Sequence, residues 1–321
     1  MKKLSLYITK EIINPMQKQL EEYYEIEVNA SNKSLNLDEL KEKIKDKDAI
    51  ISMLSDPLTR EVLSAAKKLK IIAQYAAGYD NIELEYANKR GIIVTNTPGV
   101  LSETTADLTW ALILSVSRRV CEADRYVKTG LWNEGWGPKL LLGRDVYGKT
   151  IGIIGFGRIG QAVARRAFGF NMRILYYSRS RKIDLESKIK AEYADLPTLL
   201  KEADYITIHT PLTEQTYHML GEKEFKMMKK NAYLVNTSRG KVIDEKALIK
   251  ALKEGWISGA GLDVFEIEPI EEDNPLLKMD NVVLTPHIGS ASVETRTRMA
   301  EVVAENLIAF AKGLNPPNRV I

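Results

Sequence analysis

The chain has 321 residues, of which 45% are hydrophobic and 28% charged, so it is long enough for two globular domains. Basic residues number 46 and acidic residues 43, and this net charge of +3 excludes general electrostatic binding to nucleic acid or a membrane surface. The single cysteine, Cys121, permits no internal disulfide and indicates a reducing compartment. We interpret it as a packing residue of a helix.

Short apolar runs alternate with charged, amphipathic segments through the first hundred residues. Two such segments, residues 37–47 and 58–70, have helical patterns. The apolar runs that we expect to be strands are residues 4–8, 24–28, 49–54, 71–76 and 92–97. Strands that alternate with helices form βαβ units, so the pattern predicts a parallel sheet covered by helices on both faces.

A second series of the same kind begins at Lys149. Its expected strands are residues 150–156, 173–178, 205–210, 232–238, 257–264 and 282–286. Between the two series the pattern predicts one long helix from about Thr104 to Val127. A last helix, residues 294–313, ends at a glycine. The pattern does not decide which of the two sheets this last helix covers.

The stretch of residues 150–170 contains the pattern GxGxxG, as Gly155-Phe156-Gly157-Arg158-Ile159-Gly160. Alone this pattern indicates only a glycine-rich turn. Here it follows an apolar strand and opens a helix, which is the context in which such glycines let a pyrophosphate approach the helix N-terminus. The stretch therefore predicts a dinucleotide site formed by Gly155, Gly157, Arg158, Ile159 and Gly160.

The strand that follows indicates which dinucleotide binds. Sites for NAD place a carboxylate about 20 residues after the glycines, where it binds the ribose 2′-hydroxyl. This chain has Ser178 at that position, followed by Arg179, Arg181 and Lys182. A hydroxyl group and guanidinium groups would bind a 2′-phosphate. The alternative is a solvated basic loop. We predict NADP as the preferred cofactor, with NAD as the alternative.

Polar residues follow three strands of the second series. Arg239 comes after residues 232–238, Glu266 and Glu268 follow 257–264, and His287 follows the last strand. Ligands of open α/β sheets bind at this edge. Arg239 could hold the oxygens of a 2-oxo acid and His287 could protonate its carbonyl, while a carboxylate orients the imidazole. Each residue alone could equally be a surface residue.

The other two histidines are weaker candidates for chemistry. His218 lies in a polar segment, and we interpret it as structural or exposed. His209 ends a strand just before Pro211 and could approach the cofactor, although no carboxylate is close to it in sequence. The apolar run at the N-terminus stops at Lys10, too short for a signal peptide, and no run reaches the roughly 20 residues of a membrane span.

From about Ile71 to Pro317 the chain resembles the D-isomer-specific 2-hydroxyacid dehydrogenase family, most of all its glyoxylate/hydroxypyruvate reductases. The stretches that carry the resemblance are "AQYAAGYDNI", "TNTPGVLSETTADLTWAL", "GKTIGIIGFGRIGQAVARRAFGFNMRILYY", "HTPLTEQTYHML", "LVNTSRGKVIDEKAL", "GAGLDVFEIEP" and "NVVLTPHIGS". Several motifs in matching order are far more specific than one glycine pattern.

The resemblance implies particular site residues. The catalytic ones are Arg239 in "TSRG", Glu268 (the glutamate before the proline of "FEIEP") and His287. Backbone N–H groups of Ala77 and Gly78 would bind the substrate carboxylate, although valine is common in the family where this chain has Ala77. The remaining implied positions are Leu54 and Ser290 for substrate, and Thr104, Pro211, Thr237 and Asp263 for the cofactor. We read Asp244 as a helix N-cap, and we predict no metal site.

The resemblance further implies two doubly wound α/β domains, with a Rossmann dinucleotide domain inserted into a flavodoxin-like substrate domain. We expect the substrate domain at residues 1–98 and 289–321 and the dinucleotide domain at 99–288. The expected protein is a cytoplasmic homodimer that reduces glyoxylate or hydroxypyruvate to the D-2-hydroxy acid, with no nucleic-acid or membrane partner. The alternatives are a D-lactate or 3-phosphoglycerate dehydrogenase, and a cofactor-sensing, corepressor-like interaction protein.

Overall fold

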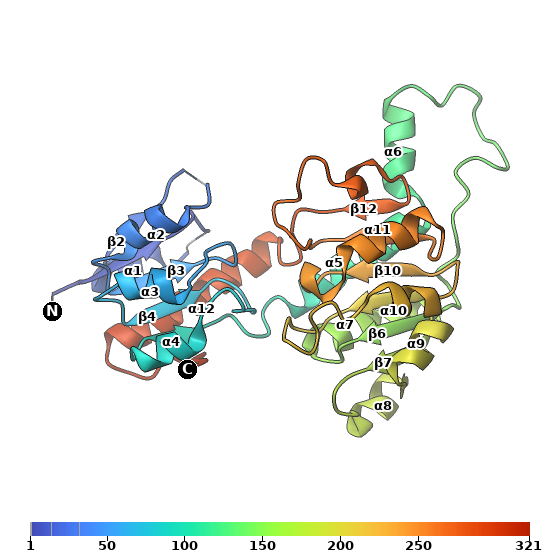
Figure 1. The fold of residues 1–321 in the computed structure, drawn as a ribbon. Coiled ribbons are helices and arrows are strands. Elements are labelled where there is room, and N and C mark those ends of the chain that lie inside the picture. Colours follow the sequence, from blue (N-terminus) through green and yellow to red (C-terminus); the bar gives the residue numbers. More distant parts are fainter. Residues whose placement is uncertain (1, 14, 32) are drawn as a thin grey trace. The chain divides into compact units, whose positions relative to one another are not determined.

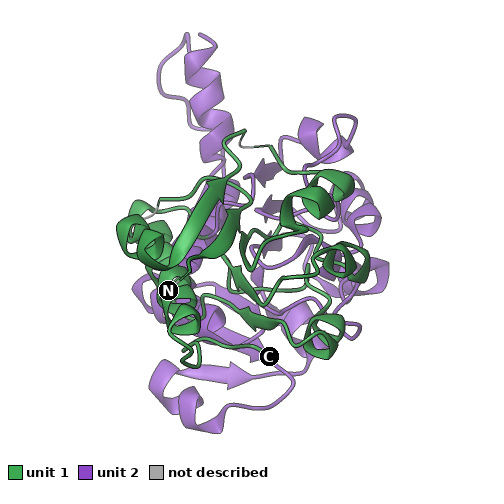
Figure 2. Cartoon of the chain, turned by 90° about the vertical axis from the view of Figure 1, so that its left-hand side faces the viewer, with its two compact units in different colours: residues 1–101, 290–321 green, residues 102–289 purple. Residues whose placement is uncertain are grey.

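The protein is described from a computed structural model that covers residues 2–13, 15–31 and 33–321. The chain divides into two compact units (Figure 2). Unit 1 consists of residues 1–101 and 290–321, and unit 2 consists of residues 102–289. Unit 2 is therefore an insertion between the two segments of unit 1.

Among its described residues, unit 1 has a five-stranded parallel sheet of order β2-β1-β3-β4-β5, the doubly wound order of flavodoxin-like folds (Figure 1). The strands are β1 (Leu4–Ile8), β2 (Tyr24–Val28), β3 (Ala49–Ser52), β4 (Ile71–Gln74) and β5 (Ile93–Thr95). The helices are α1 (Gln17–Tyr23), α2 (Leu37–Ile44), α3 (Arg60–Ala65), α4 (Leu84–Lys89) and α12 (Val293–Ala311).

Both faces of this sheet are covered by apolar side chains. One core contains Leu20 of α1 and Met299 of α12, and the other contains Leu40 of α2 and Val62 of α3. The last helix of the chain therefore covers the sheet of unit 1. Polar caps fix where these helices begin, because a side chain satisfies an N–H group that the first turn leaves free. Asn36, for example, accepts from the N–H of Glu39 at 2.9 Å.

Unit 2, whose residues are all described, has a seven-stranded parallel sheet of order β12-β11-β10-β9-β6-β7-β8. The strands are β6 (Thr150–Ile154), β7 (Arg173–Tyr177), β8 (Ala191–Tyr193), β9 (Tyr205–Ile208), β10 (Tyr233–Asn236), β11 (Gly259–Leu262) and β12 (Val282–Leu284). The helices are α5 (Ser102–Ser117), α6 (Val120–Lys128), α7 (Arg158–Ala167), α8 (Ile183–Ile189), α9 (Leu196–Glu202), α10 (Glu222–Met227) and α11 (Glu245–Lys253), with short 3₁₀ turns at Phe168–Phe170, Gly240–Val242 and Pro275–Lys278.

The strand order reverses between β6 and β9, which makes that crevice the switch point where dinucleotides bind in such sheets. Helices α5 and α7 contribute to the core on one face of the sheet, and α9, α10 and α11 to the core on the other. The expected fold class, two doubly wound parallel-sheet α/β domains, is confirmed. The three-residue strand β8 was not predicted, since its short sequence has no apolar run.

Two details of the sequence analysis are wrong. The long helix expected between Thr104 and Val127 is two helices, because Arg119 adopts a left-handed conformation with φ of 55° between α5 and α6. Cys121 lies on α6 and is exposed, so it is not a packing residue. Helix α6 has no buried residue, and with the chain after it α6 extends away from the sheet of unit 2 (Figure 1).

Candidate active site at the carboxyl edge of the unit 2 sheet

Parallel strands bring the chemically active side chains of unit 2 to one edge of its sheet. Arg239 follows β10, Glu268 follows β11 and His287 follows β12, and these strands are neighbours in the sheet. The glycine-rich turn follows β6 and the basic loop follows β7, at the same edge. The sequence places each residue after a strand, but only the strand order makes the three polar groups neighbours.

His287 and Glu268 form a direct pair. The imidazole Nδ1 lies 2.7 Å from Oε2 of Glu268, and the other carboxylate oxygen accepts from the N–H of Phe265 at 3.0 Å. An ionised carboxylate only accepts hydrogen bonds, so Nδ1 carries the proton of this bond. The outward nitrogen, Nε2, is then the atom that can hold or release a proton toward a substrate. About a third of each side chain is exposed, so reactants can reach the pair.

The electrostatic surroundings keep Glu268 ionised. Burial raises the pKa of its carboxyl group, but the hydrogen bond from His287, the charge of His287, the Phe265 N–H and the charge of Arg239 together outweigh burial. The net pKa of Glu268 is below its ordinary value. The charged carboxylate of Glu268 therefore fixes the orientation of the His287 ring through the hydrogen bond to Nδ1.

The backbone at His287 is held in a strained shape by Asp263. His287 has φ of 54°, an uncommon conformation for a residue with a side chain. The buried carboxylate of Asp263 accepts from Thr285 Oγ1 at 2.6 Å and from the N–H groups of Ile288 and Gly289, each at 2.8 Å. Asp263, expected only to contact the cofactor, thus fastens the turn that carries the imidazole.

Arg239 lies in a turn that packs tightly against the loop of Glu268. A Cβ atom on Gly240 would lie 1.9 Å from the backbone of Phe265, so only glycine allows the two segments to approach so closely. Asn236, at the end of β10, holds the turn by donating to the carbonyl of Arg239 at 2.9 Å. This close approach explains why the Arg239 charge acts on Glu268.

The glycine-rich turn fits a dinucleotide. Gly155 has φ of 94°, and a Cβ atom there would lie 2.5 Å from the carbonyl oxygen of His209. On Gly160 a Cβ would lie 2.1 Å from the carbonyl oxygen of Gly155, so helix α7 packs closely on β6. Gly157, the N-cap of α7, has nothing within 4 Å of its Cβ position. The helix therefore presents its first N–H groups to open space, as a pyrophosphate requires.

The loop after β7 has no carboxylate at the position where NAD sites carry one. Ser178 stands there and donates to the carbonyl of Ser180 at 2.8 Å. Arg179 is exposed and makes no hydrogen bond or ion pair with residues 2–13, 15–31 or 33–321. Arg181, by contrast, is engaged in a two-pronged ion pair with Glu186.

The remaining predicted cofactor residues of unit 2 differ in what they contact. The hydroxyl of Thr237 lies 2.9 Å from that of Thr109 in α5, and both are buried, so this pair fastens the end of β10 to α5. The carbonyl of Pro211 accepts from Thr216 at 2.7 Å. Thr104 lies in the first turn of α5 and is partly buried. Thr109 has no sequence signal beyond its place in an apolar helix.

Unit 1 has its own network at the carboxyl edge of its sheet. The side chain of Gln74, at the end of β4, accepts a hydrogen bond from Ser52 at 2.6 Å and donates one to Asn81 at 2.8 Å. The side chain of Asn81 in turn donates to the backbone carbonyls of Met53 and Asp56. This network ties together the two loops that carry the predicted substrate residues Leu54, Ala77 and Gly78. The polar Gln74 in an otherwise apolar strand was the signal that sequence reasoning overlooked.

In the loop after β4, the backbone carbonyls of Ala77 and Gly78 accept hydrogen bonds, but the backbone N–H groups of the same two residues donate none to the described residues. Asn96 donates to the carbonyl of Ala77 at 2.8 Å, and Gln74 donates to that of Gly78 at 3.3 Å. Within the described ranges, the backbone N–H groups of Ala77 and Gly78 make no hydrogen bond. The fourth predicted substrate residue of unit 1, Ser290, is partly buried and begins the second segment of that unit.

The other two histidines, His218 and His209, make no hydrogen bond to His287 or Glu268 among the described residues. His218 Nε2 lies 2.8 Å from Oε1 of Glu266, and the ring of Tyr217 stacks on His218. This second His–Glu pair fastens the segment before α10 to the loop of Glu268. The two ring nitrogens of His209 are buried without a hydrogen-bond partner among the described residues. Burial lowers the pKa of His209 to about 3, so its ring is neutral near pH 7.

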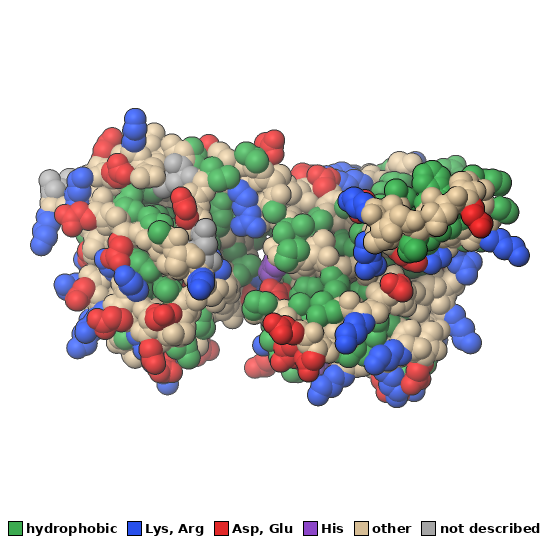
Figure 3. Space-filling view, turned by 90° about the horizontal axis from the view of Figure 1, so that it is seen from above, with side chains coloured by type: hydrophobic (Ala, Val, Ile, Leu, Met, Phe, Trp, Pro, Cys, Tyr) green, Lys and Arg blue, Asp and Glu red, His purple; other side chains and the backbone are tan. Residues whose placement is uncertain are grey.

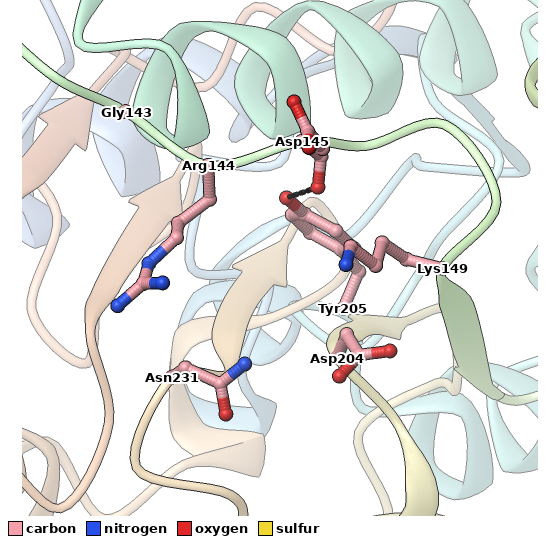
Figure 4. Close-up of a pocket in the computed structure, with 7 residues that line it drawn as sticks. All are labelled: Gly143, Arg144, Asp145, Lys149, Asp204, Tyr205 and Asn231. Atoms are coloured by element: carbon pink, nitrogen blue, oxygen red, sulfur yellow. Dashed lines mark hydrogen bonds between the residues drawn. The ribbon is translucent and has the colours of Figure 1, made fainter.

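A polar pocket of about 200 Å³ lies elsewhere in unit 2 (Figure 4). Lys149, Asp204 and Asn231 line it, and they lie one or two residues before β6, β9 and β10. The pocket is therefore at the amino edge of the sheet, opposite the carboxyl edge that carries His287. Across the described ranges no group of three or more His, Cys, Asp or Glu side chains could hold a metal ion, and no helix is long and apolar enough to cross a membrane.

A doubly wound sheet with a glycine-rich turn at its switch point and an Arg, Glu, His cluster on the same edge defines a dinucleotide-dependent oxidoreductase. Residues 110–289 match the family described as D-isomer specific 2-hydroxyacid dehydrogenase, NAD binding domain. A glyoxylate reductase from Korarchaeum cryptofilum is 58% identical over 98% of this chain and 95% of its own length.

Solved structures agree with this match. A protein from Thermus thermophilus is 45% identical with a TM-score of 0.93, covering 99% of this chain and 100% of that one. An NADPH-dependent glyoxylate/hydroxypyruvate reductase from Sinorhizobium meliloti, solved with NADP and malonate, is 32% identical with a TM-score of 0.88 over 99% and 97% of the two chains. The chain belongs to the D-isomer specific 2-hydroxyacid dehydrogenase family. It is an NAD(P)-dependent oxidoreductase.

Proposed function

We propose that the protein reduces glyoxylate, hydroxypyruvate or both to the D-2-hydroxy acid, with NADPH as the preferred hydride donor. The observation that carries this proposal is the pair of His287 Nδ1 and Glu268 Oε2 at 2.7 Å beside Arg239. This cluster supplies a proton donor, its orienting base and a fixed cation, which is what reduction of a 2-oxo acid needs. The names of the relatives support the substrate class.

Each catalytic residue has a distinct proposed role. Arg239 binds the substrate oxygens through charge-assisted hydrogen bonds. His287 gives the proton on Nε2 to the carbonyl oxygen as hydride reaches the carbonyl carbon, which neutralises the negative charge that develops on that oxygen. Glu268 keeps the ring oriented and stabilises the imidazolium before transfer. A bound nicotinamide supplies the hydride.

The two units have separate proposed roles. Unit 2 binds the dinucleotide through the turn of Gly155, Gly157 and Gly160, with Arg158 and Ile159 opening helix α7 beneath the pyrophosphate. Unit 1 binds the substrate carboxylate through the N–H groups of Ala77 and Gly78, which the described residues leave unoccupied. We propose lesser contacts to substrate from Leu54 and Ser290, and to cofactor from Thr104, Pro211, Thr237 and Asp263.

The proposed preference for NADP is supported by the loop after β7. Ser178 in place of a carboxylate removes the group that would repel a 2′-phosphate, and Arg179 offers an exposed guanidinium. A related reductase solved with NADP supports the same choice. The single cysteine of the chain supports the proposed cytoplasmic location.

Steady-state kinetics with glyoxylate, hydroxypyruvate and pyruvate, each with NADPH and with NADH, test the proposal. We expect kcat/KM to be highest with glyoxylate or hydroxypyruvate and with NADPH. A preference for pyruvate would indicate a D-lactate dehydrogenase instead. A preference for NADH with the same acids would contradict the cofactor assignment alone, and absence of turnover with all six pairs would contradict the enzyme proposal.

We also propose that the protein is a homodimer assembled through α6 and the chain that follows it. Hydrophobic side chains gather over this region (Figure 3), and the large exposed ones are Val120, Val127, Leu131, Trp132, Trp136, Leu140, Leu142 and Tyr147. Exposed apolar groups in such number on one segment are typical of a protein–protein interface.

Sedimentation equilibrium tests this assembly. We expect the wild-type protein to have the mass of two chains. The double variant Leu131→Glu/Trp136→Glu should shift to the mass of one chain, because two buried charges without partners oppose association. As a control, Leu314→Glu places a charge on another exposed apolar residue and should leave the mass unchanged. A monomeric wild-type protein would contradict the proposal.

A further inference from the structure

The cations of the loop after β7 are not equivalent. Arg179 has no ion-pair partner in the described chain, whereas Arg181 donates from Nε to Oε1 of Glu186 at 2.7 Å and from Nη2 to Oε2 at 2.8 Å. The Arg181 guanidinium also lies 5.9 Å from the centre of the Tyr193 ring. A two-pronged pair of this geometry cancels most of the charge that Arg181 would offer to an anion.

The partner of Arg181 is itself held in place. Oε1 of Glu186 accepts a second hydrogen bond, from the hydroxyl of Tyr176 in β7 at 2.7 Å. That same hydroxyl accepts from the backbone N–H of Lys182 at 2.8 Å, so it also fixes the end of the basic loop. Only 17% of the Glu186 side chain is exposed. The hydrogen bonds from Arg181 and Tyr176 lower the pKa of Glu186 to about 2, so it is fully charged near pH 7.

The tyrosine connects this ion pair to the phosphate-binding turn. The ring of Tyr176 is buried and stacks on Phe156, with 4.1 Å between ring centres. Phe156 is the residue between Gly155 and Gly157 of the turn. The hydrogen bond from the Tyr176 hydroxyl therefore links Glu186 to the aromatic pair beside the phosphate-binding turn.

We propose that Glu186 is a specificity-determining residue, which limits the preference for a 2′-phosphate by holding Arg181 in a neutral pair. This inference rests on the proposed function, in which the 2′-phosphate of NADP binds at the end of β7. Of the two arginines, Arg179 is then the one available to the phosphate. Arg181 contributes only to the extent that the phosphate competes with the Glu186 carboxylate, so the discrimination between NADP and NAD is smaller than two arginines would give.

Removing the charge of Glu186 tests this inference directly. In Glu186→Gln the amide oxygen can still accept from Tyr176, while the two-pronged pair with Arg181 is lost. We expect the Kd of adenosine 2′,5′-bisphosphate, measured by calorimetry at fixed salt, to fall about fivefold, the size of effect that one surface ion pair can have. The Kd of adenosine 5′-monophosphate, which lacks the 2′-phosphate, should change by less than about twofold.

The chain offers a matched control for the change of net charge. Glu192 on β8 pairs with Arg173 at the amino end of β7, with Nη2 to Oε2 at 2.7 Å. Glu192→Gln removes the same charge from an Arg–Glu pair that joins β7 to β8, and Arg173 lies at the opposite end of β7 from the basic loop. We expect it to leave the Kd of the bisphosphate unchanged. In an Arg181→Gln background, Glu186→Gln should also give no gain.

The outcomes separate the two proposals. If the wild-type protein binds the bisphosphate no more tightly than the monophosphate, the proposed preference for NADP is wrong. If the wild type prefers the bisphosphate but Glu186→Gln leaves its Kd unchanged or weakens binding, the role of Glu186 is overturned while the cofactor assignment stands. An equal gain in Glu192→Gln, or a gain that persists without Arg181, also overturns it.

Discussion

Replacing His287 by asparagine is expected to lower kcat for glyoxylate by about 100- to 10,000-fold, the usual contribution of a positioned general acid. Asparagine tolerates the left-handed backbone, with φ of 54°, that this position requires, so the change removes the proton donor with little strain. An amide cannot transfer a proton at neutral pH. The Kd for NADPH, measured by the quenching of protein fluorescence, should stay within about threefold, since the role proposed for His287 involves the substrate and not the cofactor.

His218 provides a closely matched control. It also has a left-handed backbone, with φ of 49°, and it also pairs with a glutamate, at 2.8 Å from Glu266. We expect His218→Asn to cost little activity, less than about fivefold, because the His218 ring is occupied by its stacking on Tyr217 and its pairing with Glu266. Equal losses of kcat in the two variants would show that both histidines act structurally, and the proton-donor role of His287 would then be abandoned.

Replacing Arg239 by glutamine should lower kcat/KM for glyoxylate by about 100- to 1,000-fold, as the loss of a fixed donor to a developing oxyanion does. The neutral amide of glutamine is still polar, but it lacks the positive charge and the two parallel N–H donors with which a guanidinium group binds substrate oxygens. Arg239→Lys should recover only part of the loss, because an ammonium group cannot make two parallel hydrogen bonds. Guanidinium ion added to an Arg239→Ala variant should restore activity in proportion to its concentration.

A structural arginine serves as the comparison for Arg239. Arg173 pairs with Glu192 and Glu202 at the amino end of β7. It therefore lies at the amino edge of the parallel sheet, whereas Arg239 lies at the carboxyl edge. Arg173→Gln should lower the melting temperature slightly and leave kcat/KM unaltered. If added guanidinium fails to restore Arg239→Ala while its secondary structure is intact, then Arg239 maintains the loop of Glu268 and does not bind the substrate.

The sequence pattern was a good guide to the strands and a poor one to helix boundaries. Twelve strands are described, and all but β8 coincide with apolar runs that were identified in advance. Such runs are informative because parallel strands are buried on both faces. The break at Arg119 was not visible, since the residues on both sides of it have a continuous helical pattern and one left-handed residue has no apolar signature.

The candidate site was partly visible in advance. The sequence and its resemblance to the family indicated which of Glu266 and Glu268 belongs with His287, and the 2.7 Å distance places Glu268 there. Neither pattern nor resemblance revealed that Asp263 fastens the turn of His287 or that Glu186 occupies Arg181. Both are hydrogen-bonded contacts whose atoms must be placed to within a few tenths of an ångström, and sequence spacing does not have that precision.

The amino-acid sequence by itself determined the parallel α/β class, the glycine-rich turn before α7 and the absence of a carboxylate at Ser178, because each depends on local periodicity or on one residue type. The local pattern left open which sheet the last helix covers, and only the resemblance assigned it to the substrate domain. In the tertiary structure α12 shares a core with β1 and β4 of unit 1. It also decided that β10, β11 and β12 are neighbours, which brings Arg239, Glu268 and His287 together. Strand order arises from long-range pairing between residues far apart in the chain, and no local pattern encodes it.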